Sequence, residues 1–428
     1  MAPFYACRSV EHALSRRQFL AGAVAGLGGL SFAHMIQPAA AEQLRRMQKR
    51  VLVIFLAGGL SQLESWDPKP GTNTGGPFLD IATSVSGTHI CELLPFTARQ
   101  MDKIALVRGI NTAEDEHSRG AYIMQTGRRQ QPAETYPHLG SVAAKLLAPP
   151  TSALPGYIHV TPSGSSGFNR QDAAFLGPRF ASVTLADGNP PANLLRPPTL
   201  TEQADMERNQ LRARINQRFA QGRRSADTEA YTNSYDQAAQ IMRQRAIFDI
   251  SREPAHIRDS YGNQEFGRHC LLARRLLENG VTFVKVTHSN YDTHHENFDF
   301  HIEQLGEFDR TYSTLLDDLA QRGMLESTLV VVMSEFGRTP NINRNMGRDH
   351  WSRAWSVALA GCGIKGGAVV GRTNANGTAV TDRQVHGGHL FHTYFKALGL
   401  NPTRNHYVDG RPIPMADPTA THIPEVLA

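Results

Sequence analysis

Five short apolar runs, each followed by polar residues, constrain the fold of this chain more than any other feature. The clearest reads Val51-Leu-Val-Ile-Phe-Leu56 and ends in Ala57-Gly58-Gly59. The others cover residues 104–107, 281–286, 328–333 and 355–360. A short continuous apolar run between turn residues is typical of a strand that is buried on both faces, as in a parallel sheet. We therefore expect a largely parallel sheet.

Helical patterns lie between these runs. Over residues 298–322, apolar side chains recur at spacings of three and four, and Gly323 closes the predicted helix. Strands that alternate with helices favour an α/β fold, with a sheet between helical layers. Residues 149–198 hold nine prolines and are expected to be mostly irregular, and residues 200–250 are expected to form a pair of helices. We interpret residues 42–428 as one domain with an insertion at about 150–250.

The N-terminal 41 residues have the features of an export signal. Arg16 and Arg17 precede an uncharged stretch rich in glycine and alanine, and three alanines precede Glu42. This pattern is similar to a twin-arginine signal peptide, which implies contact with that export machinery and a periplasmic or secreted mature chain. The alternative is a membrane anchor, but four glycines between residues 22 and 29 make the stretch weakly hydrophobic. We therefore expect no stable membrane anchor.

Composition excludes several classes of protein. With 40% hydrophobic and 19% charged residues, the chain can bury a substantial core and is not a disordered protein. Its net charge is +5, and the export signal alone holds three arginines and one glutamate. The remaining charge is ordinary, and none of the recurrent nucleic-acid-binding motifs is present, so we expect no nucleic-acid partner. The four cysteines form neither a zinc-ribbon pattern nor a dense disulfide framework.

Polar clusters follow the predicted strands. In an open α/β sheet, functional residues lie beyond the carboxyl ends of the strands, where the loops converge. Carboxylates and imidazoles in these clusters suit zinc, calcium, magnesium or manganese. The predicted ligands are Asp292, His294, Glu335, Asp349 and His350. Each fragment alone also fits a loop of solvated polar groups, and only their convergence would indicate a metal site.

The motifs of the chain, taken in order, resemble a bacterial exported family called domain of unknown function 1501. They are Gly58-Gly-Leu-Ser-Gln62, Trp66-Asp-Pro-Lys-Pro70, Thr126-Gly-Arg128, Phe175-Leu-Gly-Pro178, Asp292-Thr-His294, Ser334-Glu-Phe-Gly-Arg-Thr-Pro340 and Gly347-Arg-Asp-His-Trp351. That family is similar in fold to alkaline phosphatases and sulfatases. The resemblance implies a doubly wound α/β sheet and hydrolysis of phosphate or sulfate esters with one or two bound metal ions.

Two segments are similar to sulfatases in particular. Residues 118–128 end in Thr-Gly-Arg, like the sulfatase nucleophile helix, and Ser334-Glu-Phe-Gly337 stands where relatives have Ser-Asp-His-Gly. The chain departs from that pattern at the nucleophile, which Asp115 replaces. It departs again at Phe336, which stands in place of a metal-binding histidine, and at Gly58 and Gly59, where relatives hold their first ligand.

These departures imply a hydrolase without the usual covalent intermediate. Asp115 or His117 is expected to bind the metal or to orient the water that attacks the ester in one step. Arg119 and Arg128 are expected to bind the tetrahedral anion of a small-molecule or polysaccharide ester. Ser61 is an alternative nucleophile, although it also fits a turn serine. The competing hypothesis is a catalytically degenerate binding or assembly protein on the same scaffold.

Overall fold

The computed structural model describes residues 48–132, 134–149, 152–162, 167–187, 195–221, 226–408 and 410–428. The predicted export signal, including Arg16 and Arg17, lies outside these described residues. Residues 48–428 form one compact unit.

Among the described residues, nine strands form a single sheet in the order β13-β4-β12-β9-β1-β8-β5-β7-β6. The strands are β1 (Arg50–Leu56), β4 (Ile104–Ile110), β5 (Tyr157–Thr161), β6 (Gly167–Asn169), β7 (Ser182–Ala186), β8 (Phe283–His288), β9 (Thr328–Met333), β12 (Trp355–Ala360) and β13 (Val369–Val370). Strand β12 is antiparallel to β4 and β9, and β6 is antiparallel to β7, whereas the other pairs are parallel. The predicted mostly parallel sheet is confirmed, and each of the five apolar runs lies in or overlaps one of its strands.

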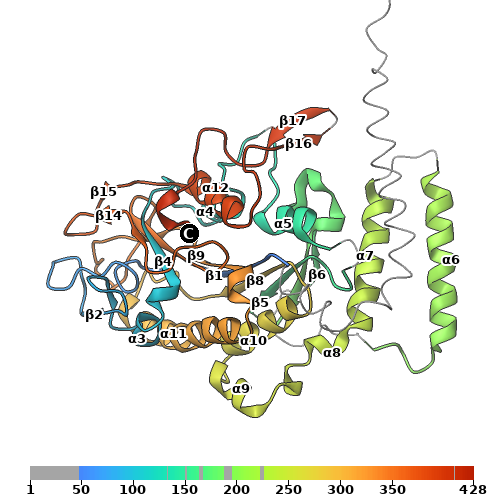
Figure 1. The fold of residues 1–428 in the computed structure, drawn as a ribbon, viewed down its shortest axis with the longest axis horizontal. Coiled ribbons are helices and arrows are strands. Elements are labelled where there is room, and N and C mark those ends of the chain that lie inside the picture. The colour runs from blue at the N-terminus through green and yellow to red at the C-terminus, as the bar shows by residue number, and fades with distance from the viewer. Residues whose placement is uncertain are drawn as a thin grey trace, which may run out of the picture. The chain divides into compact units, whose positions relative to one another are not determined.

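Helices cover both faces of this sheet, which makes it doubly wound (Figure 1). Side chains of β1 alternate between the two layers: Leu52, Ile54 and Leu56 join one core cluster, and Val51, Val53 and Phe55 join the other. The first layer contains α3 (Pro95–Ala98), α9 (Ala255–Tyr261), α10 (Glu265–Glu278) and α11 (Asn297–Gln321), and the second contains α4 (His117–Thr126), α5 (Leu139–Leu147) and α12 (Gly387–Ala397). Helix α11 is the helix predicted over residues 298–322.

The segment 149–198 is more regular than we expected. Strands β5 and β7 lie inside it and pair in parallel with the central sheet. Pro155 and Pro162 stand outside the ends of β5, where their missing amide hydrogens break no ladder bond. The prediction of a mostly irregular segment was wrong because the prolines mark the borders of short strands.

The helical pair predicted over residues 200–250 is present as α6 (Glu202–Ala220) and α7 (Ala226–Arg243). Helix α6 has no buried residue, consistent with its polar sequence. Within the described residues, no helix combines the length and apolar character that a membrane crossing requires.

The direction of the strands determines where the loops meet. Strands β1, β8 and β9 are parallel, and β4 runs the same way because both β4 and β9 are antiparallel to β12. Their carboxyl ends therefore lie along one edge of the sheet. The loops that follow these four strands carry most of the predicted site residues.

Candidate metal centre

Three histidines and one aspartate from separate loops meet at this edge. His117 is the first residue of α4, after β4, whereas Asp292 and His294 lie in the loop after β8. His350 lies on β11 (His350–Trp351), which pairs with β10 (Gly337–Arg338) beyond β9. We call His117, Asp292, His294 and His350 the histidine cluster.

The Nε2 atoms of the three histidines converge on the carboxylate of Asp292. His117 Nε2 lies 3.3 Å from Asp292 Oδ2, and His294 and His350 Nε2 lie 3.2 and 3.1 Å from Oδ1. His294 Nε2 is also 3.1 Å from His350 Nε2. Three imidazole nitrogens and a carboxylate thus share one small volume.

The other ring nitrogen of each histidine faces an oxygen. His117 Nδ1 lies 2.8 Å from Glu335 Oε1, His294 Nδ1 lies 2.7 Å from Asp349 Oδ1, and His350 Nδ1 lies 2.7 Å from the carbonyl oxygen of Asp115. A carboxylate or carbonyl at Nδ1 requires the hydrogen there, which leaves the Nε2 lone pair directed into the cluster. All three histidines are held in the orientation that metal-binding histidines adopt.

The cluster fits a divalent ion. Donor atoms of His117, Asp292 and His350 all lie within 4.8 Å of one another. Ligand atoms that share a tetrahedral Zn²⁺ at about 2.0–2.1 Å lie roughly 3.3 Å apart, close to the separations observed. Two imidazole lone pairs facing each other across 3.1 Å repel unless a cation or a proton lies between them. The donor set of nitrogen and oxygen suits zinc or manganese.

Arg338 fixes the charge of Asp292. Its fully buried guanidinium donates to Asp292 Oδ1 and to the main-chain oxygens of Gly58, Gly59 and Arg348. Burial alone would raise the pKa of Asp292, but the hydrogen bond and charge of Arg338 outweigh it and lower that pKa to about 2. Asp292 is therefore ionised at neutral pH, as a metal ligand must be.

The contacts with the two supporting acids, Glu335 and Asp349, also shift pKa values at the cluster. The hydrogen bond that His117 donates to Glu335, opposed by partial burial, raises the pKa of His117 above its ordinary value. The hydrogen bond with His294 is the main cause of a lowered pKa at Asp349. Protons therefore compete with a metal for His117 more strongly than for an ordinary histidine.

Two glycines permit the loops to approach this closely. A Cβ on Gly58 would lie 2.3 Å from the amide nitrogen of Asp292, and the φ of Gly58 is +118°. A Cβ on Gly347 would lie 1.9 Å from the carbonyl oxygen of His294. Only glycine fits at either position without moving the loop that carries the cluster.

The cluster is accessible from solvent. The exposed fractions of the side chains are 47% for Asp292, 39% for His117, 37% for His294 and 22% for His350. A catalytic metal keeps a coordination position for water or substrate, whereas a structural metal is enclosed. The exposure of the cluster would leave such a position open.

The structure brings the five predicted metal ligands together, but only three of them direct donor atoms into the cluster. Asp292, His294 and His350 contribute donor atoms to the cluster. Glu335 instead accepts from His117 and from the amide of Gly58 at 2.9 Å, and Asp349 accepts from His294. Both acids therefore orient histidines, because their oxygens are occupied by ring nitrogens and a main-chain amide.

The predicted catalytic residues have different positions. His117 belongs to the cluster. The side chain of Asp115 is exposed, and it is the main-chain oxygen of this residue that contacts His350. Ser61 is completely buried in the turn after β1, and its Oγ has no hydrogen-bond partner among the described residues. A hydroxyl without access to solvent cannot attack an ester, so Ser61 has no place in the chemistry below.

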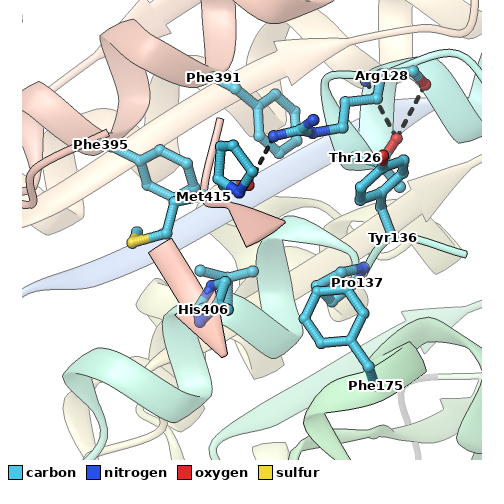
Figure 2. Close-up of a pocket in the computed structure, with 11 residues that line it drawn as sticks. Thr126, Arg128, Tyr136, Pro137, Phe175, Phe391, Phe395, His406 and Met415 are labelled. Carbon is cyan, nitrogen blue, oxygen red and sulfur yellow. Dashed lines mark hydrogen bonds between the residues drawn. The ribbon is translucent and has the colours of Figure 1, made fainter. Parts of the chain in front are cut away.

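The two predicted anion-binding arginines are both engaged. Arg119 is 59% exposed beside His117 and pairs with Glu114 at 3.1 Å. Arg128 donates to the main-chain oxygens of Pro414 and Ala416 and stacks on Tyr136, with its guanidinium 4.5 Å from the ring centroid. Figure 2 shows Arg128 in a mainly apolar pocket beside Phe391, with none of the cluster residues in its lining. The expectation that Arg128 faces the metal site is therefore not met, because its donors bind the C-terminal segment.

Sequence reasoning missed the roles of Arg338 and Phe336. The Phe336 ring packs against His117 and His350, with centroids 4.9 and 4.3 Å away. Both residues lie in the motif Ser334–Pro340. The available signal was that Arg338 and Asp292 both follow predicted strands, so their side chains could meet at the same edge of the sheet. Phe336 therefore forms an apolar wall against two histidines of the cluster.

Comparisons with solved structures give low similarity over most of the chain. They include alkaline phosphatase from the Antarctic bacterium TAB5 (14% identity, 83% of this chain and 99% of that one, TM-score 0.37). They also include the lipoteichoic acid synthase LtaP from Listeria monocytogenes (8%, 82% and 72%, 0.38) and PsFucS1 sulfatase from Pseudoalteromonas sp. (12%, 85% and 72%, 0.36). At these scores, the similarities do not identify the chemistry of the site.

A comparison with curated proteins found no match. The model of the family described as "Protein of unknown function (DUF1501)" matches residues 48–427, which include every residue of the histidine cluster. The order of motifs from Gly58 to Trp351 had indicated the same family. The chain belongs to the DUF1501 family.

Proposed function

We propose that this protein is an exported, metal-dependent hydrolase of phosphate or sulfate esters. One observation carries the proposal: three histidines, each held at Nδ1 by an oxygen, direct Nε2 toward an ionised aspartate at an open edge of the sheet. This arrangement orients ligands for a metal and leaves room for a substrate.

The residues take the following roles. His117, Asp292 and His350 would hold the ion, and the ion would polarise the ester oxygen and lower the pKa of a water. His294 lies beside these three and is backed by Asp349 at 2.7 Å, so its Nε2 takes the proton from the attacking water. Asp349 orients the ring of His294 and stabilises the imidazolium that forms.

The anion needs a positive group near His117. The N-terminus of α4 is already capped, because Glu116 accepts hydrogen bonds from the amides of Ser118 and Arg119. The Arg119 side chain is exposed and adjacent, and its partner Glu114 is a neighbour on the same loop. Arg119 therefore turns from Glu114 to the ester oxygens when the substrate binds.

The predicted nucleophile Ser61 is buried, so water attacks the ester directly, and the bond to the leaving oxygen breaks as the bond to water forms. Direct attack inverts the configuration at a chiral phosphorus, whereas a covalent intermediate retains it. Product from a chiral phosphorothioate ester should therefore be inverted, without a burst of the first product. Retention with a stoichiometric burst would overturn the one-step route.

The central test combines metal content and turnover. The mature chain should bind zinc or manganese in stoichiometric amount and hydrolyse p-nitrophenyl phosphate or p-nitrophenyl sulfate. A folded chain that binds the metal but turns over no ester with zinc, manganese, magnesium or calcium would favour the second function, a binding or assembly protein on this scaffold. The full burial of Ser61 and the engagement of Arg128 are the observations that favour that alternative.

Export through the twin-arginine pathway is part of the proposal. Arg16 and Arg17, the weakly hydrophobic stretch and the alanines before Glu42 support it. Replacement of both arginines by lysine should retain the precursor in the cytoplasm, and the N-terminus of the exported protein should lie near Glu42. An exported protein that still begins at Met1 would contradict the signal.

A further inference from the structure

A second group of metal-binding side chains lies on elements that take no part in the histidine cluster. Asp187 follows β7, and Glu265 and His269 lie one turn apart on α10. Donor atoms of the three residues all lie within 4.8 Å of one another. Because residues four apart share one face of a helix, Glu265 and His269 project together toward Asp187.

His269 is the residue that points to a ligand. Its side chain is only 1% exposed, and Nε2 has no hydrogen-bond partner among the described residues. That atom lies 3.9 Å from Glu265 Oε1, too far for a hydrogen bond. A buried imidazole nitrogen without a partner is unfavourable, and here it faces two carboxylates.

The rest of the site is arranged for a cation. Burial lowers the pKa of His269 to about 4, and a hydrogen bond with the main chain of Asp187 acts in the opposite direction. The ring is therefore neutral at pH 7, with one nitrogen held by the main chain, which is the arrangement found in metal-binding histidines. The amide of Asp187 donates to the carbonyl oxygen of Thr161 at 3.0 Å, which anchors the carboxylate to the end of β5.

The charge of the surrounding residues also favours a bound cation. Asp187 and Glu265 are both acidic, and Arg268 pairs with one of them, its Nη2 lying 3.6 Å from Asp187 Oδ1. Arg268 is 37% exposed and also donates to the carbonyl oxygen of Asn263, so it is able to turn toward solvent. Two carboxylates and one imidazole prefer zinc or manganese among the common divalent ions.

We propose that Asp187, Glu265 and His269 form a second divalent-metal site, separate from the histidine cluster. Its one buried and two half-exposed ligands join the end of β7 to the first turn of α10. A metal there would tie together two elements on the β5–β7 side of the sheet and stabilise the fold.

The test removes the first site before it examines the second. A background chain with His117→Gln and His350→Gln is loaded with Zn²⁺ and dialysed, and zinc is measured by mass spectrometry. One zinc per chain is expected, and His269→Gln in this background should lose that equivalent. His256→Gln, at an exposed histidine on neighbouring α9, is the matched control and should retain it.

Three further measurements keep the site testable if His269→Gln fails to fold. Glu265→Gln changes a half-exposed residue and should weaken zinc binding at least about tenfold. Arg268→Gln should strengthen it about threefold, because a competing surface charge is removed. Zinc should also raise the Tm of the background chain but not of folded His269→Gln. Absence of zinc in the background, or zinc retained by folded His269→Gln, would overturn the site.

Discussion

Arg348 and His350 are two residues apart in the sequence, yet they belong to regions with opposite properties. Arg348 and its partner Glu64 are both completely buried, with Arg348 Nη2 2.7 Å from Glu64 Oε1. The other donors of Arg348 reach the main-chain oxygens of Thr74, Thr339 and Pro340. Asn297 donates to the second oxygen of Glu64. Every strong donor in this buried pair has an acceptor.

The histidine cluster differs because its inner contacts are crowded and open to solvent. Its outer contacts, at Nδ1, are satisfied, but its inner contacts crowd three nitrogens around one carboxylate that is 47% exposed. A satisfied and sealed group of charges stabilises a fold, whereas converging donors at the surface bind a ligand. The comparison teaches that charge alone does not separate a structural ion pair from a functional site. The two differ in whether every donor and acceptor has a partner and in whether the side chains reach solvent.

The largest expected effect on stability comes from breaking the sealed pair. Glu64→Ala leaves the buried charge of Arg348 without its partner and should lower the free energy of unfolding by about 3–5 kcal/mol. Urea unfolding measures this. The control Glu303→Ala removes an exposed acid from α11 and should leave stability almost unchanged. If Glu64→Ala unfolds at the same urea concentration as the control, the pair is not structural.

The histidine cluster should respond in the opposite way. Asp292→Asn removes the charge on which the three histidines converge, so metal binding should be lost and ester hydrolysis should fall by about a hundredfold or more. Because an asparagine side-chain oxygen can still accept from the buried Arg338, the free energy of unfolding should fall by only about 1–2 kcal/mol, less than after Glu64→Ala. The matched control is Asp299→Asn, at an exposed acid in the first turn of α11. Full activity in folded Asp292→Asn would contradict the assignment.

The pH dependence of metal affinity sharpens the role of Glu335. Its hydrogen bond raises the pKa of His117, so the apo form gains stability that is full below about pH 6.5 and disappears as pH rises through the raised value. Metal must displace that proton, so affinity should rise over the same interval. Glu335→Gln should move the affinity profile to lower pH in calorimetric titrations. An unmoved profile would show that Glu335 does not control His117.

The smallest effect is expected at Arg128. Arg128→Lys loses the donation of Nη2 to the main-chain oxygens of Pro414 and Ala416 and the stacking of the guanidinium on Tyr136, and it should lower the free energy of unfolding by about 1 kcal/mol. Sulfate and phosphate affinity, measured by calorimetry, should not change, because the side chain lies away from the cluster. Weaker anion binding would restore the anion-binding role that the sequence suggested.

The sequence predicted the sheet better than the site. Continuous apolar runs such as Val51–Leu56 are specified by burial on both faces, which is visible in one segment. A carboxylate such as Glu335 can bind a metal directly or accept a hydrogen bond from a histidine that binds it. Which of the two occurs depends on the atom of another loop that reaches the carboxylate. Local patterns cannot separate these roles, because the distinction arises only when α4, β8 and β9 come together. Strands β5 and β7 were not predicted for a related reason. They are short, and the prolines that flank them made the whole segment look irregular.

Arg338 has a consequence for the thermodynamics of metal uptake. Its guanidinium joins the turn after β1, the loop after β8 and the segment before β11 through Gly58, Asp292 and Arg348. These loops are therefore already fixed in place before an ion arrives, and little conformational entropy remains to be lost on binding. Metal binding should therefore be fast and should not move the backbone. Almost all of the free energy of coordination should contribute to the metal affinity, because little of it is spent on ordering the loops.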